Sequence, residues 1–500
     1  MNLLFRTDAN IAIGTGHVMR CLALAQAWQD AGGHSTFVMA DSTPAVEKRL
    51  RSEHVDFVHF AVSPGSASDA KQTTQLARQN GSSWVVVDGY QFGADYQRSL
   101  KEEGIQLLFV DDNGHAASYA ADIVLNQNAH AETHLYAHRS PYTRLLLGPR
   151  YAMLRREFRA WREWSREIPQ LARRVLVTLG GSDPENATLK VINALQQLKV
   201  DGLQVIALVG GSNPHLHSIE RAAATNSGRQ IKIVVDAIRV PEFMAEADVA
   251  VCCAGSSCWE MCLLGLPAVL LDLASNQVPV ARKLDQSGLA IHIGSATQVS
   301  SDQIAAALES LIRSPDTRKH MCERSRLLVD GRGAERVRTF LDGDLRLRRS
   351  LESDCQTIWQ WANDPEVRAV SFRREPIPWE QHVDWFKSKL ADPSAFFYVA
   401  INHAGQAIGQ VRYQCDKTRA VLSVNIASDF RGKGFGKKVL LLATEELFQS
   451  SSVSGIDAYV KPSNQSSLRL FESAGFRRNG THTIEGHPAI HFSLEKGTRL

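Results

Sequence analysis

The stretch from residue 3 to residue 25 constrains the fold of this chain more than any other part of the sequence. A short apolar strand at residues 3–5 leads through a turn that holds Gly14 and Gly16 into a helix with apolar positions at helical spacing. Glycines at such a turn let backbone approach a ligand closely, and the exposed N–H groups at a helix start attract anions. The stretch therefore predicts an α/β unit with an anion-binding turn.

His17 stands where this predicted helix begins. The positive end of the helix dipole disfavours a protonated imidazole there, and a neutral imidazole beside a bound diphosphate is suited to act as a general base on water. A histidine and a glycine pair in such a turn can also be purely structural. A structural turn would not need all the polar and charged residues that surround this one, which are Arg6, Asp8, Asn10 and Arg20.

Length and composition exclude several classes of protein. A chain of 500 residues predicts about three or four domains, and 44% hydrophobic with 22% charged residues is typical of a soluble globular protein. The formal net charge of +3 gives no argument for binding nucleic acid or an anionic membrane. Because Arg6 and Asp8 interrupt the first apolar run, we expect no signal peptide or transmembrane helix, and a cytoplasmic protein.

Four of the eight cysteines cluster between residues 252 and 262. Cys252 and Cys253 end a predicted strand, and Cys258 and Cys262 lie one turn apart on the next helix, without paired histidines. Buried free thiols are the better interpretation, and a metal site is the weaker one.

The first 150 residues alternate strands and helices, which predicts a doubly wound parallel sheet with ligands at the carboxyl ends of its strands. Polar clusters follow three of these strands, on the edge predicted for His17. These clusters are Asp88-Gly89-Tyr90, Asp111-Asp112-Asn113 and Asn126-Gln127-Asn128. The acids can simply cap turns, but a shared cleft explains their common placement.

A second alternating pattern starts at residue 175. Its first strand is followed by Gly180-Gly181-Ser182-Asp183-Pro184, which indicates a phosphate-binding loop or a close approach of backbone to a ligand. A later strand runs into Gly255-Ser256-Ser257 and a helix, where N–H groups and hydroxyls can hold a diphosphate. Glu260, one turn further, can accept hydrogen bonds from a ribose diol or be an ordinary helix acid.

The residues Arg6-Thr-Asp-Ala-Asn10 and Ile13-Gly-Thr-Gly-His-Val-Met-Arg-Cys-Leu22 resemble the N-terminal signature of the UDP-sugar hydrolases of pseudaminic acid biosynthesis. These enzymes remove UDP from a 2,4-diacetamido-2,4,6-trideoxy hexose and resemble the GT-B glycosyltransferases. The resemblance implies two Rossmann-like lobes that face each other. Residues 1–150 would form the lobe with a catalytic His17, and residues 151–342 the UDP-binding lobe.

By this resemblance, Glu260 binds ribose, Ser256 and Ser257 contact phosphate, and Asn276 with Gln277 face the sugar. His17 deprotonates water, which attacks the anomeric carbon with inversion and releases UDP. Because the attack is at a sugar carbon, we expect no metal requirement. The complete set of expected substrate-binding residues is Arg6, Asp8, Asn10, Gly14, Gly16, Arg20, Tyr90, Gly181, Ser256, Ser257, Glu260, Asn276 and Gln277.

The pattern changes near residue 341. A strand at 345–348, a Trp-rich helix ended by Asn363-Asp364-Pro365, and strands at 396–401, 407–413 and 419–426 predict an antiparallel α+β domain with few helices over residues 343–500. A hairpin is expected at 402–405.

The turn Arg431-Gly-Lys-Gly-Phe-Gly436 before a helix presents N–H donors and positive charge to a pyrophosphate, and it lacks the spacing of a P-loop. It resembles the coenzyme A loop of the GNAT acyltransferases, which implies acetyl-CoA as cosubstrate. The expected binding residues are Ile426, Arg431, Gly432, Lys433, Gly434, Phe435, Gly436, Asn464 and Ser467.

The segment His382-Val-Asp-Trp385-Phe386 is similar to the GNAT enzymes that acetylate the 4-amino group of a UDP-linked amino sugar in the same pathway. Many members of the family carry a proton-donating Tyr where Phe471 stands, and Phe cannot donate a proton. The acid of this domain is therefore unassigned. His382 and Asn425 are the candidates for its general base.

These observations predict a bifunctional enzyme that acetylates a UDP-amino sugar and hydrolyses the UDP-diacetamido product. Its partners would be nucleotide sugars and UDP, without nucleic acid or membrane insertion, and the oligomeric state is left open. Two alternatives remain: a GT-B glycosyltransferase fused to an acyltransferase, and a non-catalytic nucleotide-sugar module tethered to an active GNAT domain.

Overall fold

The computed structural model describes residues 2–10, 13–181, 183–211, 213–225, 230–341, 345–402 and 406–496, without the side chain of residue 83. The chain divides into two compact units, Met1–Arg338 and Thr339–Leu500. The first unit contains both predicted Rossmann-like lobes, each with its own sheet. The predicted boundary at residue 342, and residues 403–405 of the predicted hairpin, lie outside the described residues.

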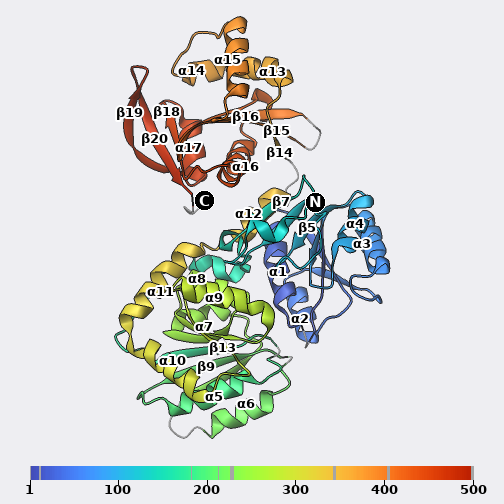
Figure 1. The fold of residues 1–500 in the computed structure, drawn as a ribbon, viewed down its shortest axis with the longest axis vertical. Coiled ribbons are helices and arrows are strands. Elements are labelled where there is room, and N and C mark those ends of the chain that lie inside the picture. The colour runs from blue at the N-terminus through green and yellow to red at the C-terminus, as the bar shows by residue number, and fades with distance from the viewer. Residues whose placement is uncertain are drawn as a thin grey trace. The chain divides into compact units, whose positions relative to one another are not determined.

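The first sheet has seven parallel strands in the order β3-β2-β1-β4-β5-β6-β7 (Figure 1). The strands are β1 (Asn2–Thr7), β2 (His34–Met39), β3 (Asp56–His59), β4 (Ser82–Asp88), β5 (Gln106–Val110), β6 (Ile123–Asn126) and β7 (Arg144–Leu147). The helices are α1 (Gly16–Gln29), α2 (Pro44–Ser52), α3 (Ala67–Gln79) and α4 (Ala94–Glu102). The strand order reverses between β1 and β4, which is where such sheets bind ligands.

The second sheet has six parallel strands in the order β10-β9-β8-β11-β12-β13. They are β8 (Arg174–Thr178), β9 (Gln204–Val209), β10 (Gln230–Val235), β11 (Val249–Cys253), β12 (Ala268–Asp272) and β13 (Ile291–Ser295). The helices are α5 (Ala187–Gln197), α6 (Leu216–Ala224), α7 (Val240–Glu246), α8 (Ser257–Leu264), α9 (Val278–Gln286), α10 (Ser301–Arg313), α11 (Pro315–Leu328) and α12 (Gly333–Leu341). The order reverses again between β8 and β11, so each lobe has its own ligand edge.

Short single-turn helices lie in the connection between the two lobes and beside the site residues. They are η1 (Thr133–Tyr136), η2 (Pro149–Tyr151), η3 (Arg156–Trp161) and η4 (Ser275–Gln277). The clustered cysteines 252, 253, 258 and 262 are buried free thiols, as the sequence predicts.

The second unit contains a seven-stranded sheet in the order β14-β15-β16-β17-β18-β20-β19. The strands are β14 (Arg346–Arg349), β15 (Ala395–Ile401), β16 (Ala407–Asp416), β17 (Arg419–Ile426), β18 (Gly455–Val460), β19 (Arg477–Ile484) and β20 (His487–Glu495). Neighbouring strands are antiparallel except β17 and β18, which run parallel.

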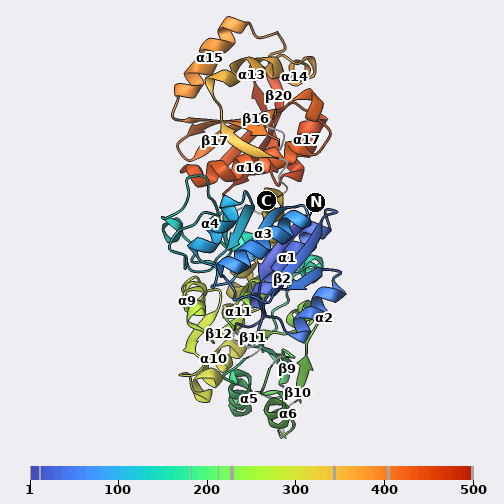
Figure 2. The same cartoon turned by 90° about the vertical axis from the view of Figure 1, so that its right-hand side faces the viewer.

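Helices cover both faces of this sheet, with α13 to α15 on one face and α16 on the other (Figures 1 and 2). They are η5 (Glu352–Asp354), α13 (Cys355–Ala362), α14 (Pro365–Val370), α15 (Trp379–Ala391), η6 (Ser428–Phe430), α16 (Phe435–Ser450) and α17 (Gln465–Ser473). The α/β and α+β fold classes are confirmed, but the prediction of few helices here is wrong. The apolar side chains of α15 are largely aromatic, and no helix was predicted from the sequence over Trp379–Ala391.

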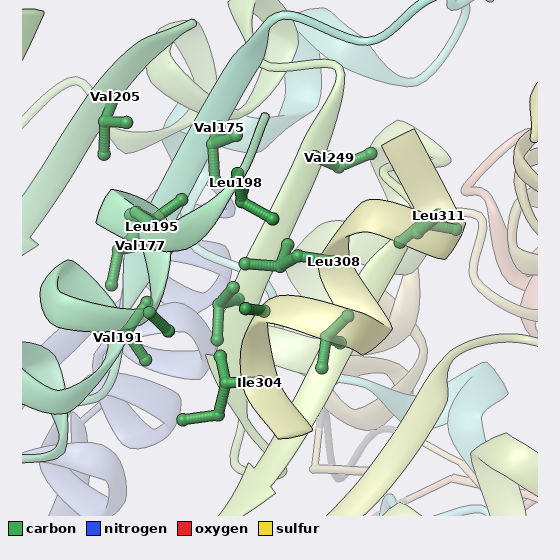
Figure 3. Packing of buried hydrophobic residues seen from close by; sticks show 14 of the residues in the cluster. Val175, Val177, Val191, Leu195, Leu198, Val205, Val249, Ile304, Leu308 and Leu311 are labelled. Atoms are coloured by element: carbon green, nitrogen blue, oxygen red, sulfur yellow. The ribbon is translucent and has the colours of Figure 1, made fainter. Parts of the chain in front are cut away.

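Helix α10 shows how sequence sets the packing of the second lobe. Ser300 and Gln303 form a capping box that starts the helix. Its apolar residues recur at helical spacing and pack on α5 and on β8 and β11, where Leu308 is fully buried (Figure 3). Within the described residues, no helix combines the length and apolar character needed to cross a membrane.

We predict that Leu308→Ala lowers the free energy of unfolding of the first unit by about 2–5 kcal/mol, because it removes buried methyl groups and leaves a cavity. Pulse proteolysis in urea measures the change. Leu327→Ala, at a side chain that is 75% exposed, is the matched control and should change the value by less than about 0.5 kcal/mol. Equal losses in the two variants would contradict this account of the core.

Candidate functional site

The start of α1 in the first lobe and the loop after β8 in the second lobe meet at Gly181. A Cβ atom at Gly181 would lie 2.9 Å from the Oγ1 of Thr15, the residue that precedes α1. A glycine is needed at this position because any side chain would press on the facing loop. Gly14 has a φ of +73°, and open space surrounds both Gly14 and Gly16.

His17 lies in the first turn of α1 and contacts the carboxyl end of β4. Its Nδ1 is 2.6 Å from the Oδ1 of Asp88. The Nη2 of Arg20 also lies 3.1 Å from Nδ1, but the shorter contact is to a carboxylate that can only accept a hydrogen bond, so Nδ1 is the donor of this pair. This is the arrangement of a histidine poised to take a proton at Nε2, oriented by a carboxylate behind it.

Arg20, one turn further along α1, holds that carboxylate in place. Its Nε donates to the Oδ2 of Asp88 at 2.6 Å and its Nη2 donates to the Oδ1 at 2.6 Å. Burial raises the pKa of Asp88, but the charges of Arg20 and then His17 outweigh it and keep the pKa below its ordinary value. Asp88 is therefore ionised and available to orient His17.

Asp112, after β5, accepts the remaining contact of Arg20. It receives hydrogen bonds from the Nη1 of Arg20 at 2.7 Å, the Nδ2 of Asn128 at 2.8 Å and the hydroxyl of Tyr90 at 2.7 Å. Burial opposes ionisation of Asp112, yet Arg20 lowers its pKa far below the ordinary value. The side chain of Asn276 donates to the Tyr90 hydroxyl at 2.7 Å, so the network extends from the first lobe to the second.

Arg6 and Asp8 are placed behind this site. Arg6 is fully buried between Asp69 and Asp8, and Asp8 accepts from the backbone N–H of Ala40 at 2.7 Å and from Gln91 at 2.8 Å. The expectation that Arg6 and Asp8 contact substrate is therefore corrected. Their buried charges instead brace the loops that follow β1, β2 and β4.

Asn10 closes the turn after β1. Its side-chain oxygen accepts from the backbone N–H of Ile13 at 2.9 Å, and its carbonyl accepts from that of Gly14 at 2.8 Å. Its amide also donates to Asp41 at 3.1 Å. Asn10 therefore shapes the glycine turn through local hydrogen bonds.

The start of α5 is occupied by a side chain of the protein itself. Asp183, with a φ of +40°, accepts hydrogen bonds from the backbone N–H groups of Ala187 and Thr188, both at 2.8 Å. The prediction of a phosphate site here is wrong, because this carboxylate already fills the anion position. The loop approaches Thr15 of the first lobe at Gly181, and the alternative, a close approach of backbone to a ligand, stays a prediction.

The start of α8 is different. Ser256 precedes it without making a side-chain cap, whereas Thr43, Ser66 and Ser300 cap α2, α3 and α10. Ser256 and Ser257 are half-buried. The N–H groups of Cys258 and Trp259 bond to the carbonyls of Gly255 and Ser256, so the candidate donors are the N–H and hydroxyl groups of Ser256 and Ser257. This helix start has the donors and the dipole that a diphosphate requires.

Glu260, one turn into α8, forms an ion pair with Arg155, whose Nη2 lies 2.8 Å from its Oε1. Burial raises the pKa of Glu260, and the charge of Arg155 opposes that effect. Gln277 accepts from the backbone N–H of Leu273 at 2.9 Å and so fixes the turn that carries Asn276.

The second unit carries its glycine turn between η6 and α16. Gly432 and Gly434 have φ values of +72° and +80°, which other residues rarely adopt. Gly434 precedes α16 without a side-chain cap, and Lys433 is exposed. This loop offers backbone donors and positive charge to an anion.

Arg431 ties the same loop to α14 and its cap. Its Nη1 contacts Asp364 at 3.1 Å and Glu366 at 2.8 Å, and its Nε donates to the carbonyl of Ile426 at 2.9 Å. Asn464 caps α17 by accepting from the N–H of Ser467 at 3.1 Å. Both side chains therefore stabilise the loops around the turn.

Residues 174–336 match the glycosyltransferase family 28 C-terminal domain, and residues 344–477 match the acetyltransferase (GNAT) domain. Over 169 residues the chain is 40% identical to an aminoglycoside N(6')-acetyltransferase type 1 from Klebsiella pneumoniae, covering 31% of this chain and 84% of that protein. Through its second unit, the chain belongs to the GNAT acetyltransferase family.

Two further relatives cover the first unit. A UDP-2,4-diacetamido-2,4,6-trideoxy-beta-L-altropyranose hydrolase from Campylobacter jejuni is 25% identical over 290 residues, 58% of this chain and 97% of that protein. An uncharacterized protein from Methanocaldococcus jannaschii is 22% identical over 504 residues, 96% of this chain and 97% of its own length. The predicted resemblance to the hydrolases, joined to a GNAT domain, is confirmed, and the two-unit chain has a full-length relative.

The candidate bases of the GNAT unit are both engaged elsewhere. His382 is 2% exposed, donates from Nε2 to the carbonyl of Cys355 at 3.2 Å and stacks on Phe386. Burial lowers its pKa. Asn425 donates to the carbonyl of Trp361 at 2.9 Å. His382 is therefore corrected from a candidate base to a packed residue that joins α13 and α15.

Phe471 packs in the core of the GNAT unit, where it is 3% exposed and stacks on Phe492. Its position gives no proton donor to the unit. Among the residues that the structure describes, no group of three or more His, Cys, Asp or Glu side chains has a geometry suited to a metal ion.

Asp88, Asp112 and Asn128 belong to the strand-end clusters for which the sequence predicts a shared cleft with His17, but they and Arg155 are absent from the expected set of substrate-binding residues. The first three follow predicted strands, so parallel register was a usable signal for them. Arg155 lies in the irregular connection between the lobes, and no local pattern marked it.

We predict that Arg20→Met destabilises the first unit by about 3–5 kcal/mol at pH 7, because it leaves two buried carboxylates without their cation. In the native protein the pKa values of Asp88 and Asp112 are lowered, so the two groups stabilise the fold at pH values above the ordinary carboxyl pKa. This stabilisation is lost as the pH falls. In the variant the two carboxylates raise each other's pKa, so stability should increase from pH 7 to pH 5. Urea unfolding at the two pH values measures the change.

Arg98→Met, at a side chain that is 52% exposed, is the control for the loss of an arginine. It should change stability by less than about 1 kcal/mol and leave its pH dependence unaltered. An Arg20 variant whose free energy of unfolding falls when the pH is lowered from 7 to 5 would contradict the proposed charge balance.

Proposed function

We propose that the chain is a bifunctional enzyme of pseudaminic acid biosynthesis. Its first unit hydrolyses UDP-2,4-diacetamido-2,4,6-trideoxy-β-L-altropyranose to the free sugar and UDP. Its GNAT unit acetylates the 4-amine of the UDP-amino-sugar precursor with acetyl-CoA. The observation that carries the hydrolase proposal is the His17–Asp88 pair at the start of α1, next to the Tyr90–Asn276 contact between the lobes.

In the proposed hydrolysis, Nε2 of His17 takes a proton from water as the water oxygen bonds to the anomeric carbon. The bond from that carbon to the diphosphate oxygen breaks, and UDP leaves with inverted configuration at the sugar. Asp88 stabilises the imidazolium that forms, because Arg20 keeps it ionised. General base catalysis of this kind contributes about 10²–10⁴-fold in rate.

The second lobe would hold the leaving group. The uncapped N–H groups and the hydroxyls of Ser256 and Ser257 suit the diphosphate, whose charge the start of α8 also stabilises. Glu260 is suited to accept from the ribose diol, since Arg155 favours its ionised form. Asn276, whose side chain donates to the Tyr90 hydroxyl, would contact the sugar.

The two reactions have a chemical order. The sugar that the first unit would hydrolyse already carries both acetamido groups, so acetylation of the 4-amine must precede loss of UDP. In the GNAT unit, the turn at 432–436 would bind the coenzyme A diphosphate through backbone N–H groups. The donor's acyl group then passes to the amine with release of coenzyme A.

We predict that His17→Asn lowers kcat for UDP release by at least about 100-fold and leaves acetyl transfer unchanged. His134→Asn, at a side chain that is 72% exposed, is the matched control. The reaction is run in ¹⁸O-labelled water with the UDP-diacetamido sugar, and mass spectrometry locates the label.

Label in the free sugar supports attack at the anomeric carbon. Label in the phosphate of UDP would mean attack at phosphorus and would overturn the mechanism. UDP release that requires an added sugar or lipid acceptor would identify a glycosyltransferase. Equal hydrolysis in the His17 variant would refute the base assignment.

For the GNAT unit we predict acetylation of UDP-4-amino-4,6-dideoxy-N-acetyl-β-L-altrosamine by acetyl-CoA, detected by the mass of the product. Gly434→Ala should raise KM for acetyl-CoA by about fivefold, because a Cβ at φ +80° costs about 1–2 kcal/mol of backbone strain in the binding loop. Gly486→Ala, at φ +78° in the β19–β20 turn, carries the same strain and should leave this KM unchanged. An equal rise in the KM for acetyl-CoA in both variants would show that the turn at 432–436 is not part of the donor site.

A further inference from the structure

A cluster of aromatic and titratable side chains lies on one face of the GNAT sheet, outside the residues assigned so far. His491 of β20 contacts Asp457 of β18, with its Nε2 2.7 Å from the Oδ1. Its ring stacks on Tyr459 at 5.1 Å between centroids and meets the edge of His482 at 4.9 Å. His491 is the member of this cluster that has a carboxylate partner.

The cluster faces away from the packed core of the unit. Ile456, Ala458 and Val460 of β18 are buried in the cluster that includes α16. Successive side chains of a strand alternate between faces, so Asp457 and Tyr459 lie on the opposite face. That is the face covered by α13 to α15 (Figure 2).

The strand register places His491 near the region where the pairing of β17 with β18 ends. The pairing of β17 with β18 ends at Val421 and Asp457, although β17 continues to Ile426 and β18 to Val460. Tyr459 lies beyond that last pair, and its cross-strand partner on β20 is His491. The coenzyme A turn follows the end of β17. The part of β18 that β17 leaves unpaired includes Tyr459, which pairs with His491 on β20.

The segment between α14 and α15 is fixed against the same end of the sheet. Lys461 donates from Nζ to the carbonyl of Ser371 at 2.6 Å. Arg373 donates to Glu485 in the β19–β20 turn at 3.0 Å. These contacts fix residues 371–373 to the end of β18 and to the β19–β20 turn.

The state of the Asp457 carboxylate determines which nitrogen of His491 is basic. Arg419 donates to both oxygens of Asp457 at 2.7 Å. Burial raises the pKa of Asp457, but the hydrogen bonds of Arg419 and His491 hold it below the ordinary value. The ionised carboxylate accepts from Nε2–H, which leaves the lone pair of His491 on Nδ1.

We propose that His491 is the general base of acetyl transfer, with Asp457 as its positioning residue. The inference deepens the proposed acetyltransferase function and rests on it. The acceptor nitrogen bonds to the thioester carbonyl carbon, the carbon–sulfur bond breaks, and coenzyme A leaves as the thiolate. The proton lost by the nitrogen goes to Nδ1 of His491.

Several charged or titratable groups surround this base. Asp457 of β18 is its ionic partner, and Arg419 of β17 pairs with Asp457 and with Glu495 of β20, the latter at 2.8 Å. Tyr459 and His482 complete the ring cluster.

His491→Gln should lower kcat for acetyl transfer by about 100-fold or more and leave KM for acetyl-CoA unchanged. The matched control is His487→Gln, at the exposed start of β20, which should stay within about threefold of the native rate. Calorimetric binding of acetyl-CoA checks that each variant is folded. A His491 variant that binds acetyl-CoA and keeps more than a third of the native kcat overturns the proposal.

Two further measurements separate catalysis from structure. His491→Ala should regain part of its kcat in added imidazole, whereas a packing defect would show no such rescue. Asp457→Asn should lower kcat for acetyl transfer and leave KM for acetyl-CoA unchanged, and an unchanged kcat would remove Asp457 from its role. If the native enzyme acetylates no amine at all, the proposed function fails. If it does and the His491 variants match it, only this inference fails.

Discussion

The guanidinium of Arg20 is the interaction on which the first site depends. It is buried with two carboxylates, Asp88 and Asp112, and contacts both. Without this cation two buried carboxylates would share the site with no arginine to compensate them, which raises the pKa of each. With it, Asp88 orients His17 and Asp112 collects the hydrogen bonds of Tyr90 and Asn128, which lead to the second lobe. The positioning of the base and the contact between the lobes therefore share one buried charge.

Helix starts show a second constraint, which is that an N-terminus can bind a ligand only if the protein leaves it unoccupied. The loops before α5 and α8 are both glycine-containing turns at the ends of parallel strands. Asp183 turns back onto the start of α5 and satisfies its N–H groups. Ser256 makes no such cap at α8. One carboxylate thus decides which of two similar turns is a candidate diphosphate site, and which serves only to let the lobes meet at Gly181.

The fold class was predictable because buried parallel strands have nearly continuous apolar sequences and the glycine turns mark their ends. The acids after β4 and β5 were also visible as strand-end clusters, but their shared cation was not, since Arg20 lies 68 residues from Asp88 in sequence. His382 carried the right chemistry in a recognisable motif, yet the packing of α13 on α15 buries it. The roles of His17 and of the other site residues in catalysis and binding stay predictions. The Asp457–His491 contact joins residues 34 apart and depends on strand register, so no local pattern revealed it.

The two units use the same electrostatic arrangement in different folds. In each, a histidine nitrogen contacts a carboxylate that an arginine also contacts: Asp88 with Arg20, and Asp457 with Arg419. The arginine keeps the carboxylate ionised, so the acid orients the histidine and does not compete with it for a proton. One imidazole nitrogen then donates to the carboxylate, and the other does not take part in this contact. The proposed removal of a water proton in the first unit and of an amine proton in the second would thus depend on the same arginine–carboxylate–histidine arrangement. It lies at a helix start in the first unit and across two strands in the second.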